Sequence, residues 1–272
     1  MLKRNQSFRK GFRYLFISLL PLTTSALQAN EVVASDLYSP SISIIIDDMG
    51  YRLNSGARAI NLPGAITYSF LPHAPHAISQ SKAAHQQSKE VMLHIPMEAE
   101  SGKKLGPGGL TECMTQKKFI KVLDANIESI PYAKGFNNHM GSLLTKSQLW
   151  MTRLMREMAN NRSLFFVDSR TTSGSVALAV ARTEGLQSIT RDIFIDHEES
   201  NEFIQQQLKK LIKQAKRKGT ALAIAHPKKI TLSILEKWLP TLESQGIKLV
   251  SVSKLIKLQQ QKQLALLNRS KN

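Results

Sequence analysis

Short apolar runs alternate along the chain with longer segments in which apolar residues recur at helical spacing. The runs are rich in Val, Ile, Phe and Leu and are bounded by turn residues, as is typical of buried parallel strands. We expect strands at residues 41–46, 64–71, 90–93, 134–138, 163–167, 188–195, 219–225 and 247–250. We expect helices at residues 53–60, 76–88, 115–131, 146–160, 174–182, 198–218 and 231–242. This alternation predicts an α/β fold, in which a parallel sheet wrapped by helices closes or nearly closes into a barrel of seven or eight β/α units.

The length of the chain favours one domain. With 272 residues, of which 42% are hydrophobic, it is long enough for one large α/β domain and too short for two generous ones. We place this domain at residues 41–256, with a linker at residues 30–40 and a basic polar tail at residues 257–272. The chain has a single cysteine, Cys113, so no internal disulfide can form and stability depends on core packing.

Residues 1–29 have the three parts of an export signal. Five basic side chains precede an apolar segment at residues 14–22, and small residues follow up to Ala29. The apolar segment is shorter than the ~20 residues that a membrane-spanning helix needs, which favours a cleaved signal over a retained anchor. We expect cleavage after Ala29, with Ala26 as the alternative, and therefore a periplasmic or secreted protein.

The net charge bears on the partners of the protein. It is +17 over the whole chain, and the protein stays strongly basic after the signal is removed. An exported protein has little access to nucleic acid, so we expect no nucleic-acid partner. The charge suits peripheral contact with the anionic envelope, either its phospholipid head groups or its acidic glycans. The alternative is a solvated surface that favours solubility.

Six of the apolar runs end at a carboxylate, an imidazole or an amide. The carboxyl ends of the strands in a parallel barrel share one rim, where α/β barrels build their active sites. Any one such residue is explained as part of an ordinary loop, but six in the same place indicate a functional rim. The residues are Asp47 and Asp48, His94, Asn137 to His139, Asp168, Asp196 and His226.

The adjacent residues Asp47 and Asp48 are the most specific indication of a functional site. Two carboxylates side by side at a buried strand end repel each other unless a cation offsets them. One can bind a metal while the other acts on a water molecule as general base. The alternative is that Asp48 caps the following helix.

Imidazoles complete this candidate site. His94 and His139 end the third and fourth predicted strands, and two imidazoles with a carboxylate and an open position form a recurrent catalytic zinc site. We therefore predict a divalent metal, most simply zinc. His226 can protonate a departing group, with Asp168 or Asp196 orienting its ring. We expect Arg191 and Asp192 to form an ion pair.

Six motifs, taken in order, resemble those of the divergent polysaccharide deacetylase family, a branch of the NodB-like carbohydrate esterases. They read IIIDDMGY, VMLHIPME, FNNHMGS, FVDSRTT, RDIFIDHE and AIAHPKK, and the resemblance covers about residues 41–256. It implies a distorted (β/α)7-8 barrel and a site for an N-acetylated or O-acetylated glycan. It also implies that Asp47 is the catalytic base, Asp48 a metal ligand and His226 the general acid.

The sequence also departs from the parent superfamily. The parent takes two ligands from a histidine pair four residues apart, whereas here Glu98 stands four residues after His94. We expect His139 as the third ligand, with Glu98 as the alternative. The parent RxPY motif is missing, and residues 137–141 stand in its place. The residues expected to contact substrate or to orient the groups that do are Glu98, Asn138, Asp168 and Asp196.

Together these features predict an exported, metal-dependent carbohydrate deacetylase that acts on an acetylated polysaccharide or murein-type glycan of the envelope. The alternative is a glycan-binding or envelope-scaffold protein that keeps the barrel without turnover. A second alternative is another metal-assisted hydrolase of esters or amides.

Overall fold

The computed structural model describes Met1, residues 39–161 and residues 163–269. The predicted export signal lies outside these residues except for Met1, and the predicted linker lies outside them except for Ser39 and Pro40. Within the described ranges, no helix combines the length and the apolar character needed to cross a membrane. The barrel and its surrounding helices belong to one compact unit.

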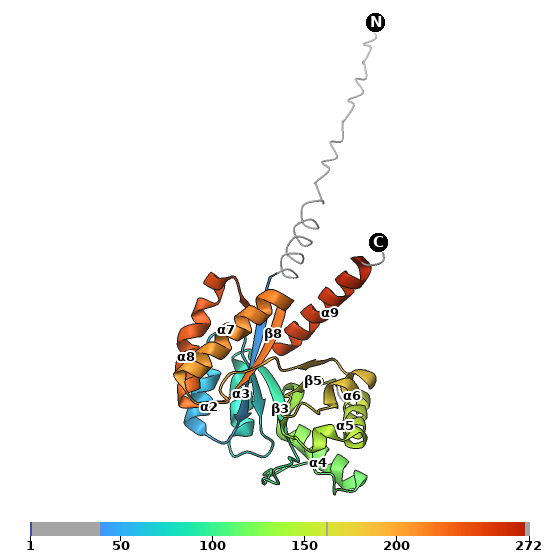
Figure 1. Cartoon of the computed structure of the whole chain (residues 1–272). Helices are drawn as coiled ribbons and strands as arrows, with labels where there is room; N and C mark the ends of the chain where they lie inside the picture. Colours follow the sequence, from blue (N-terminus) through green and yellow to red (C-terminus); the bar gives the residue numbers. More distant parts are fainter. Residues whose placement is uncertain (2–38, 162, 270–272) are drawn as a thin grey trace. The chain divides into compact units, whose positions relative to one another are not determined.

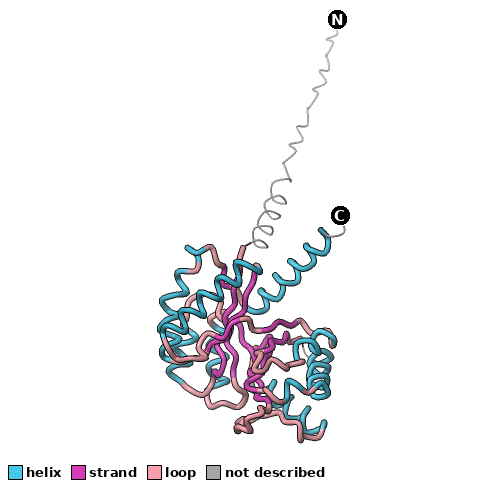
Figure 2. Tube along the Cα trace, in the orientation of Figure 1, coloured by secondary structure: helices cyan, strands magenta, loops and turns pink. Residues whose placement is uncertain are grey.

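Strands and helices alternate along the described chain (Figure 1). The strands are β1 (Ser41–Met49), β2 (Thr67–Phe70), β3 (Glu90–Met97), β4 (Ala133–Met140), β5 (Phe165–Asp168), β6 (Ser188–Thr190), β7 (Ile193–Phe194), β8 (Thr220–Ala225) and β9 (Lys248–Leu249). The helices are α2 (Leu53–Ile60), α3 (Ala77–Gln86), α4 (Gln116–Ser129), α5 (Gln148–Asn161), α6 (Ala177–Thr183), α7 (Asn201–Lys218), α8 (Lys229–Trp238) and α9 (Val252–Arg269). Short 3-10 turns are η1 (Leu144–Lys146), η2 (Leu239–Thr241) and η3 (Glu243–Gln245). Figure 2 shows the strands gathered at the centre with helices around them.

The sheet is parallel and curls into the predicted barrel. Its strand order is β6-β5-β4-β3-β2-β1-β8-β7, and β9 pairs with the start of β1. β6 and β7 lie at opposite edges, although only Arg191 and Asp192 separate them along the chain. Three Cα steps span at most about 11 Å, so the two edges must lie close together. The distorted (β/α) barrel is confirmed, but the single strand expected at residues 188–195 is wrong, because the chain leaves one edge there and joins the other.

The strands bury both of their faces. Alternation along β1 directs Ile44 and Ile46 to the outer core beneath the helices and Ile45 into the barrel interior. The interior cluster continues with Met92 and Val167, which are fully buried. The middle of the barrel is therefore a packed core, and a functional site can lie only at one of its ends.

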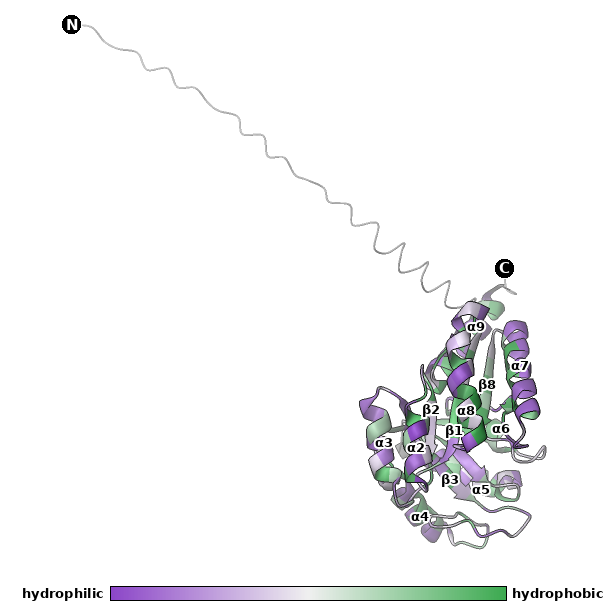
Figure 3. Ribbon diagram, turned by 90° about the vertical axis from the view of Figure 1, so that its left-hand side faces the viewer, coloured by the Kyte–Doolittle hydropathy of each residue, from purple (hydrophilic) through white to green (hydrophobic). Residues whose placement is uncertain are grey.

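The outer layer consists of amphipathic helices, as α7 illustrates. The Ser200 hydroxyl accepts a hydrogen bond from the backbone N–H of Phe203 and begins the helix, and Gly219, with φ of 80°, ends it. Ile204 and Leu208 are buried, whereas the exposed side is polar. Figure 3 shows both kinds of residue along this helix.

Helix α9 closes the end of the barrel at which the strands begin. Its first turn places Val252 and Leu255 in the interior cluster. Glu90 accepts a hydrogen bond from the backbone N–H of Ser253 at 3.1 Å, and a carboxylate there suits the positive end of the helix dipole. The helix continues across residue 257, where the sequence indicated a polar tail. Leu258 is buried, so the first part of that segment packs on the barrel.

Gly135 in β4 should not tolerate even alanine. An added Cβ would overlap the buried ring of Phe165 on the neighbouring strand. We expect Gly135→Ala to lower the free energy of unfolding by about 1–3 kcal/mol in urea or thermal unfolding. The control is Gly174→Ala, whose Cβ would meet only the flexible end of Lys146. Equal stability of the two variants would contradict this account.

Candidate metal centre and active site

Strand β1 carries two acidic residues to the barrel rim. The strand runs to Met49 instead of ending at Ile46, so Asp47 and Asp48 lie within it. Neighbours in a regular strand point to opposite faces. The register with β2 shifts between Ile46 and Met49, and Asp48 has φ of 56°, in the left-handed region. This irregularity brings both carboxylates to within 3.6 Å of Nε2 of His94.

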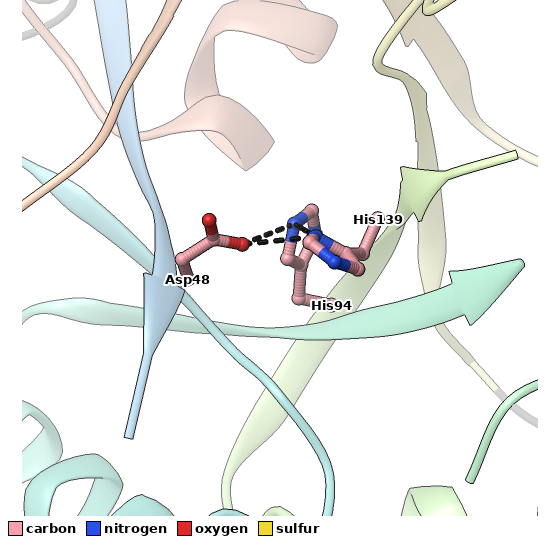
Figure 4. Close-up of side chains that lie close together, drawn as sticks. All are labelled: Asp48, His94 and His139. Carbon is pink, nitrogen blue, oxygen red and sulfur yellow. Dashed lines mark hydrogen bonds and ion pairs between the residues drawn. The ribbon is translucent and has the colours of Figure 1, made fainter. Parts of the chain in front are cut away.

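Three potential metal ligands from β1, β3 and β4 point toward one another (Figure 4). Oδ1 of Asp48 lies 2.9 Å from Nδ1 of His139 and 3.3 Å from Nε2 of His94. The two nitrogens are 3.2 Å apart. In the described part of the chain, Asp48, His94 and His139 form a group whose ligand atoms are close enough to share a metal ion.

The spacing and chemistry of these atoms fit zinc. Tetrahedral zinc with bonds of about 2.0–2.1 Å holds its ligand atoms about 3.3 Å apart. Oδ1 of Asp48 is buried and accepts no hydrogen bond of good geometry, although two imidazole nitrogens lie near it. A cation bound between Asp48, His94 and His139 would satisfy the lone pairs of these three ligand atoms. Two imidazoles and one carboxylate also leave a coordination position open for water or substrate.

Asn137 links Asp47 to His94. Its Oδ1 accepts hydrogen bonds from Nδ1 of His94 at 2.7 Å and from the Ser69 hydroxyl at 2.6 Å. Its Nδ2 donates to the two carboxylate oxygens of Asp47 at 2.9 and 3.0 Å. A carboxylate only accepts, so the orientation of the amide is fixed and Nδ1 of His94 must donate to it. Nε2 of His94 is thereby left to bind a metal.

The sequence placed Asn137 at the rim, but we predicted no role for it. The motif FNNHMGS led to Asn138 and His139, but alternation places residue 137 on the same side of β4 as His139. That spacing of two was the signal that could have found it. Asn138 accepts a hydrogen bond from the backbone N–H of Ser169 at 2.9 Å and donates to the carbonyl of Met140 at 2.7 Å. It therefore joins the end of β4 to the loop that follows β5.

Buried charges favour a cation at the rim. Burial raises the pKa of Asp47 above its usual value, although His94 and Asn137 oppose the change. Burial also acts to raise the pKa of Asp48, but His139 and His94 outweigh it and hold that pKa well below its usual range. Burial acts to lower the pKa of His94, but Asp47 and Asp48 raise it. Carboxylates that favour a proton on a buried imidazole equally favour a metal cation.

His226 lies beside Asp48, just after β8. Its Nδ1 is 2.9 Å from Oδ1 of Asp196, and its Nε2 is 3.8 Å from Oδ2 of Asp48. Asp196 is fully buried and also accepts hydrogen bonds from the backbone N–H of His226 and the Thr231 hydroxyl. Burial acts to lower the pKa of His226, but its hydrogen bond with Asp196 and the charge of that carboxylate raise it. Nε2 is the nitrogen that can give a proton to a molecule in the site.

Asp196, and not Asp168, is the carboxylate that orients His226. Asp168 shapes the loop after β5 instead. Its Oδ1 accepts a hydrogen bond from the backbone N–H of Arg170 at 2.8 Å, and its Oδ2 accepts one from the Ser175 hydroxyl at 2.8 Å.

Glu98 does not lie with the converging ligands. Its Oε2 accepts a hydrogen bond from the backbone N–H of Glu112 at 2.8 Å. His139 occupies the third position beside Asp48 and His94. The sequence left two possible third ligands, His139 and Glu98. Within the described residues, only His139 converges with Asp48 and His94.

Two hollows meet at the metal centre. One has a volume of about 850 Å³ and is lined by residues from α2 and α8. The other has a volume of about 600 Å³ and is lined by the ends of β4, β5 and β7. Asp48, His139 and His226 line both. A molecule longer than the metal centre can therefore extend from it into two different hollows.

Comparisons with known sequences identify relatives. Residues 44–256 match a family model described as divergent polysaccharide deacetylase. An uncharacterised protein of Haemophilus influenzae is 35% identical over 242 residues, which are 86% of this chain and 85% of that protein. The uncharacterised protein YibQ of Escherichia coli is 31% identical over 231 residues, which are 85% of this chain and 72% of that protein.

Solved structures share the fold. An uncharacterised protein of Agrobacterium tumefaciens matches with a TM-score of 0.77 and 24% identity, over 80% of this chain and 89% of that chain. The peptidoglycan deacetylase PdaC of Bacillus subtilis matches with a TM-score of 0.53 and 13% identity, over 86% and 98%. A CE4 family pseudoenzyme of Bacillus anthracis matches with a TM-score of 0.50 and 14% identity, over 80% and 66%. At these identities the likeness shows the fold, and activity must be argued from the site.

Zinc binding should depend on His139 and not on Glu98. His139→Ala removes one of three converging ligand atoms, and we expect the zinc affinity to fall by about a hundredfold or more. Glu98→Gln should change it by less than about twofold, because that carboxylate is bonded to a loop. Competition with a chromophoric chelator measures both affinities. The opposite ranking would make Glu98 the ligand.

Asn137→Ala should weaken zinc binding even though Asn137 is not a ligand. His94 loses the acceptor that orients its ring, a change that costs about tenfold to a hundredfold in metal affinity. Ser69→Ala is the control, because it removes only the other donor to the same oxygen. Unchanged zinc affinity in folded Asn137→Ala protein would refute this positioning role.

Proposed function

The chain belongs to the divergent polysaccharide deacetylase family, and we propose that it is an exported, metal-dependent hydrolase that removes acetyl groups from an envelope glycan. The observation that carries this proposal is the convergence of Asp48, His94 and His139 at one rim, with Asp47 and His226 beside them. A metal site, a base and an acid around one cleft are the groups that hydrolysis of an acetyl amide or ester requires.

Asp48, His94 and His139 would hold the metal, which we infer to be zinc from the donor set of two imidazoles and one carboxylate. When bound, zinc supplies a Lewis acid for the acetyl carbonyl and lowers the pKa of water. Asp48 is suited to this role because its low pKa keeps it deprotonated. Asn137 keeps the ring of His94 oriented.

Asp47 is the general base in this proposal. Its carboxylate would accept a proton from the water that attacks the acetyl carbon. Asn137 donates to both carboxylate oxygens and so fixes the plane of the group. Burial raises the pKa of Asp47, which makes the carboxylate a stronger base than one at the surface.

His226 is the general acid. Its Nε2 would give a proton to the leaving nitrogen or oxygen as the bond to the acetyl carbon breaks. Asp196 accepts a hydrogen bond from Nδ1 and stabilises the imidazolium that holds this proton beforehand. The raised pKa of His226 favours that protonated form.

We place the substrate in the cell envelope and infer an acetylated murein-type polysaccharide. The export signal predicted at residues 1–29 and the basic composition support this location. Two hollows that meet at the metal centre suit a polymer rather than a small molecule. A protein of the same fold, PdaC, is a peptidoglycan deacetylase by name.

The decisive test is acetate release by the purified, zinc-loaded protein from acetylated murein or chitooligosaccharides. We expect Asp47→Asn and His226→Gln to lower kcat by about 10²–10⁴-fold, because each removes one proton transfer. His85→Gln is the matched control, since His85 stacks on Tyr132 and takes no part in the site. Absence of acetate release from any acetylated glycan by fully loaded protein would count against the proposal.

The alternative function is glycan binding without turnover. It is favoured by the missing RxPY motif and by the existence of a pseudoenzyme with this fold. In that case Asp47→Asn and His226→Gln would leave glycan affinity unchanged, and no acetate would appear.

A further inference from the structure

Arg191 lies in the 600 Å³ hollow and does not form the ion pair expected with Asp192. Asp192 instead accepts hydrogen bonds from Nε2 of Gln214 at 2.6 Å and from the backbone N–H of Leu222 at 2.9 Å. Its carboxylate is thus engaged by α7 and β8. Arg191 and Asp192 both line the hollow beside the metal centre, but they form no ion pair with each other.

The guanidinium of Arg191 is held rigidly. Its Nε donates to the carbonyl of Ser169 at 2.7 Å, and its Nη2 donates to the carbonyl of Arg170 at 3.0 Å. Its central carbon lies 4.8 Å from the centroid of the Phe194 ring, in a cation–π arrangement. Two backbone oxygens and one aromatic face therefore fix both the position and the plane of the charge.

The rest of this guanidinium is unused. An arginine carries five N–H donors, and within the described residues three of those of Arg191 have no protein partner. Arg191 also forms no ion pair with any described residue. Asp47 and Asp168 act on it electrostatically, but from beyond ion-pair distance. Arg191 is therefore a half-buried cation that contacts no carboxylate and keeps free N–H donors. Such a group can bind an anionic group of a ligand.

The loop after β5 supplies the two carbonyl oxygens that hold Arg191. The backbone N–H of Arg170 donates to Asp168, and Arg170 has φ of 51°, a left-handed conformation that is costly for a residue with a side chain. This conformation lets the consecutive carbonyls of Ser169 and Arg170 both face Arg191. The side chain of Arg170 is exposed and lines the same hollow, where it adds a second positive charge.

The position of Arg191 relative to the reacting groups points to substrate. Phe194, on which the guanidinium stacks, also packs against His226 with ring centroids 5.4 Å apart. Arg191 and the general acid therefore pack against the same aromatic side chain. A planar fork with free N–H groups matches the two oxygens of a carboxylate.

We propose that Arg191 forms a subsite for a carboxylate carried by the glycan, so that the protein selects acidic acetylated glycans over neutral ones. This inference rests on the proposed function for the identity of the ligand as a glycan. The carboxylate would take the free Nη donors, while the acetyl group lies at the metal centre. Arg191 is then a specificity-determining residue and not a catalytic one.

The test compares one N-acetylated oligosaccharide as its free acid and as its methyl ester, which differ only in the charge of the carboxyl group. Binding of each to the zinc-loaded full chain is measured by titration calorimetry, with His226→Gln present in every protein compared so that no acetate is released during the titration. We expect the wild-type protein to bind the acid about tenfold to a hundredfold more tightly. Arg191→Gln should remove this preference by weakening binding of the acid alone. Arg191→Lys should restore part of it, because it keeps the charge but not the planar fork.

Arg52→Gln is the matched control, because Arg52 lines the other hollow; it should retain the preference for the acid. Equal loss in both variants would overturn the subsite in favour of a general electrostatic effect. No preference in the wild-type protein, or no binding of the acid, would also overturn it. These outcomes are independent of acetate release, since binding is measured without turnover. If Arg191→Gln fails to fold, the acid-to-ester ratios of the wild-type and Arg191→Lys proteins decide the question.

Discussion

The left-handed backbone at Asp48 is the constraint on which the site depends. In a regular strand, Asp47 and Asp48 would point to opposite faces, and only one carboxylate could reach the rim of the barrel interior. A left-handed residue with a side chain costs about 1–2 kcal/mol, and the register break with β2 accommodates it here. Met140 and Arg170 adopt the same conformation at the end of β4 and just after β5. Three of the six non-glycine residues with positive φ in the described chain thus lie at the site, and the packed barrel below holds them in place.

The strands, more than the loops, determine where the ligands lie. His94 on β3 and Asn137 on β4 are direct partners in the parallel register, so the hydrogen bond between their side chains follows from the pairing. The interior layer below them is fully buried and ends at α9. A slip of one residue in β4 would direct Asn137 and His139 away from the interior. The geometry of the candidate metal ligands is therefore coupled to the stability of the sheet.

Much of this arrangement was accessible from the sequence because it depends on local patterns. Apolar runs ending in polar residues identified the rim, and Asp48, His94 and His139 were predicted to share it. The sequence could not decide between Asp168 and Asp196, because both follow buried strands and only their hydrogen-bond partners differ. It also could not separate β6 from β7, since the weak strand pattern at residues 188–195 does not show that its two halves pair with strands at opposite edges. Arg191 and Asp192 illustrate the same limit, because neighbouring charges in a sequence suggest a pair that the backbone directs apart.

The buried polar groups help to distinguish hydrolysis of a glycan from glycan binding alone. Asp47 and Asp196 are buried carboxylates, and hydrogen bonds to both oxygens of each offset the free energy that burial costs. A metal accounts for Asp48, His94 and His139, and Asn137 supports one of these ligands. It does not account for His226 and Asp196, which reach the same point from β8 and β7 and add no atom to the ligand set. An oriented imidazole with a raised pKa, 3.8 Å from an oxygen of Asp48, suits proton transfer and so supports the proposed hydrolysis over the scaffold alternative.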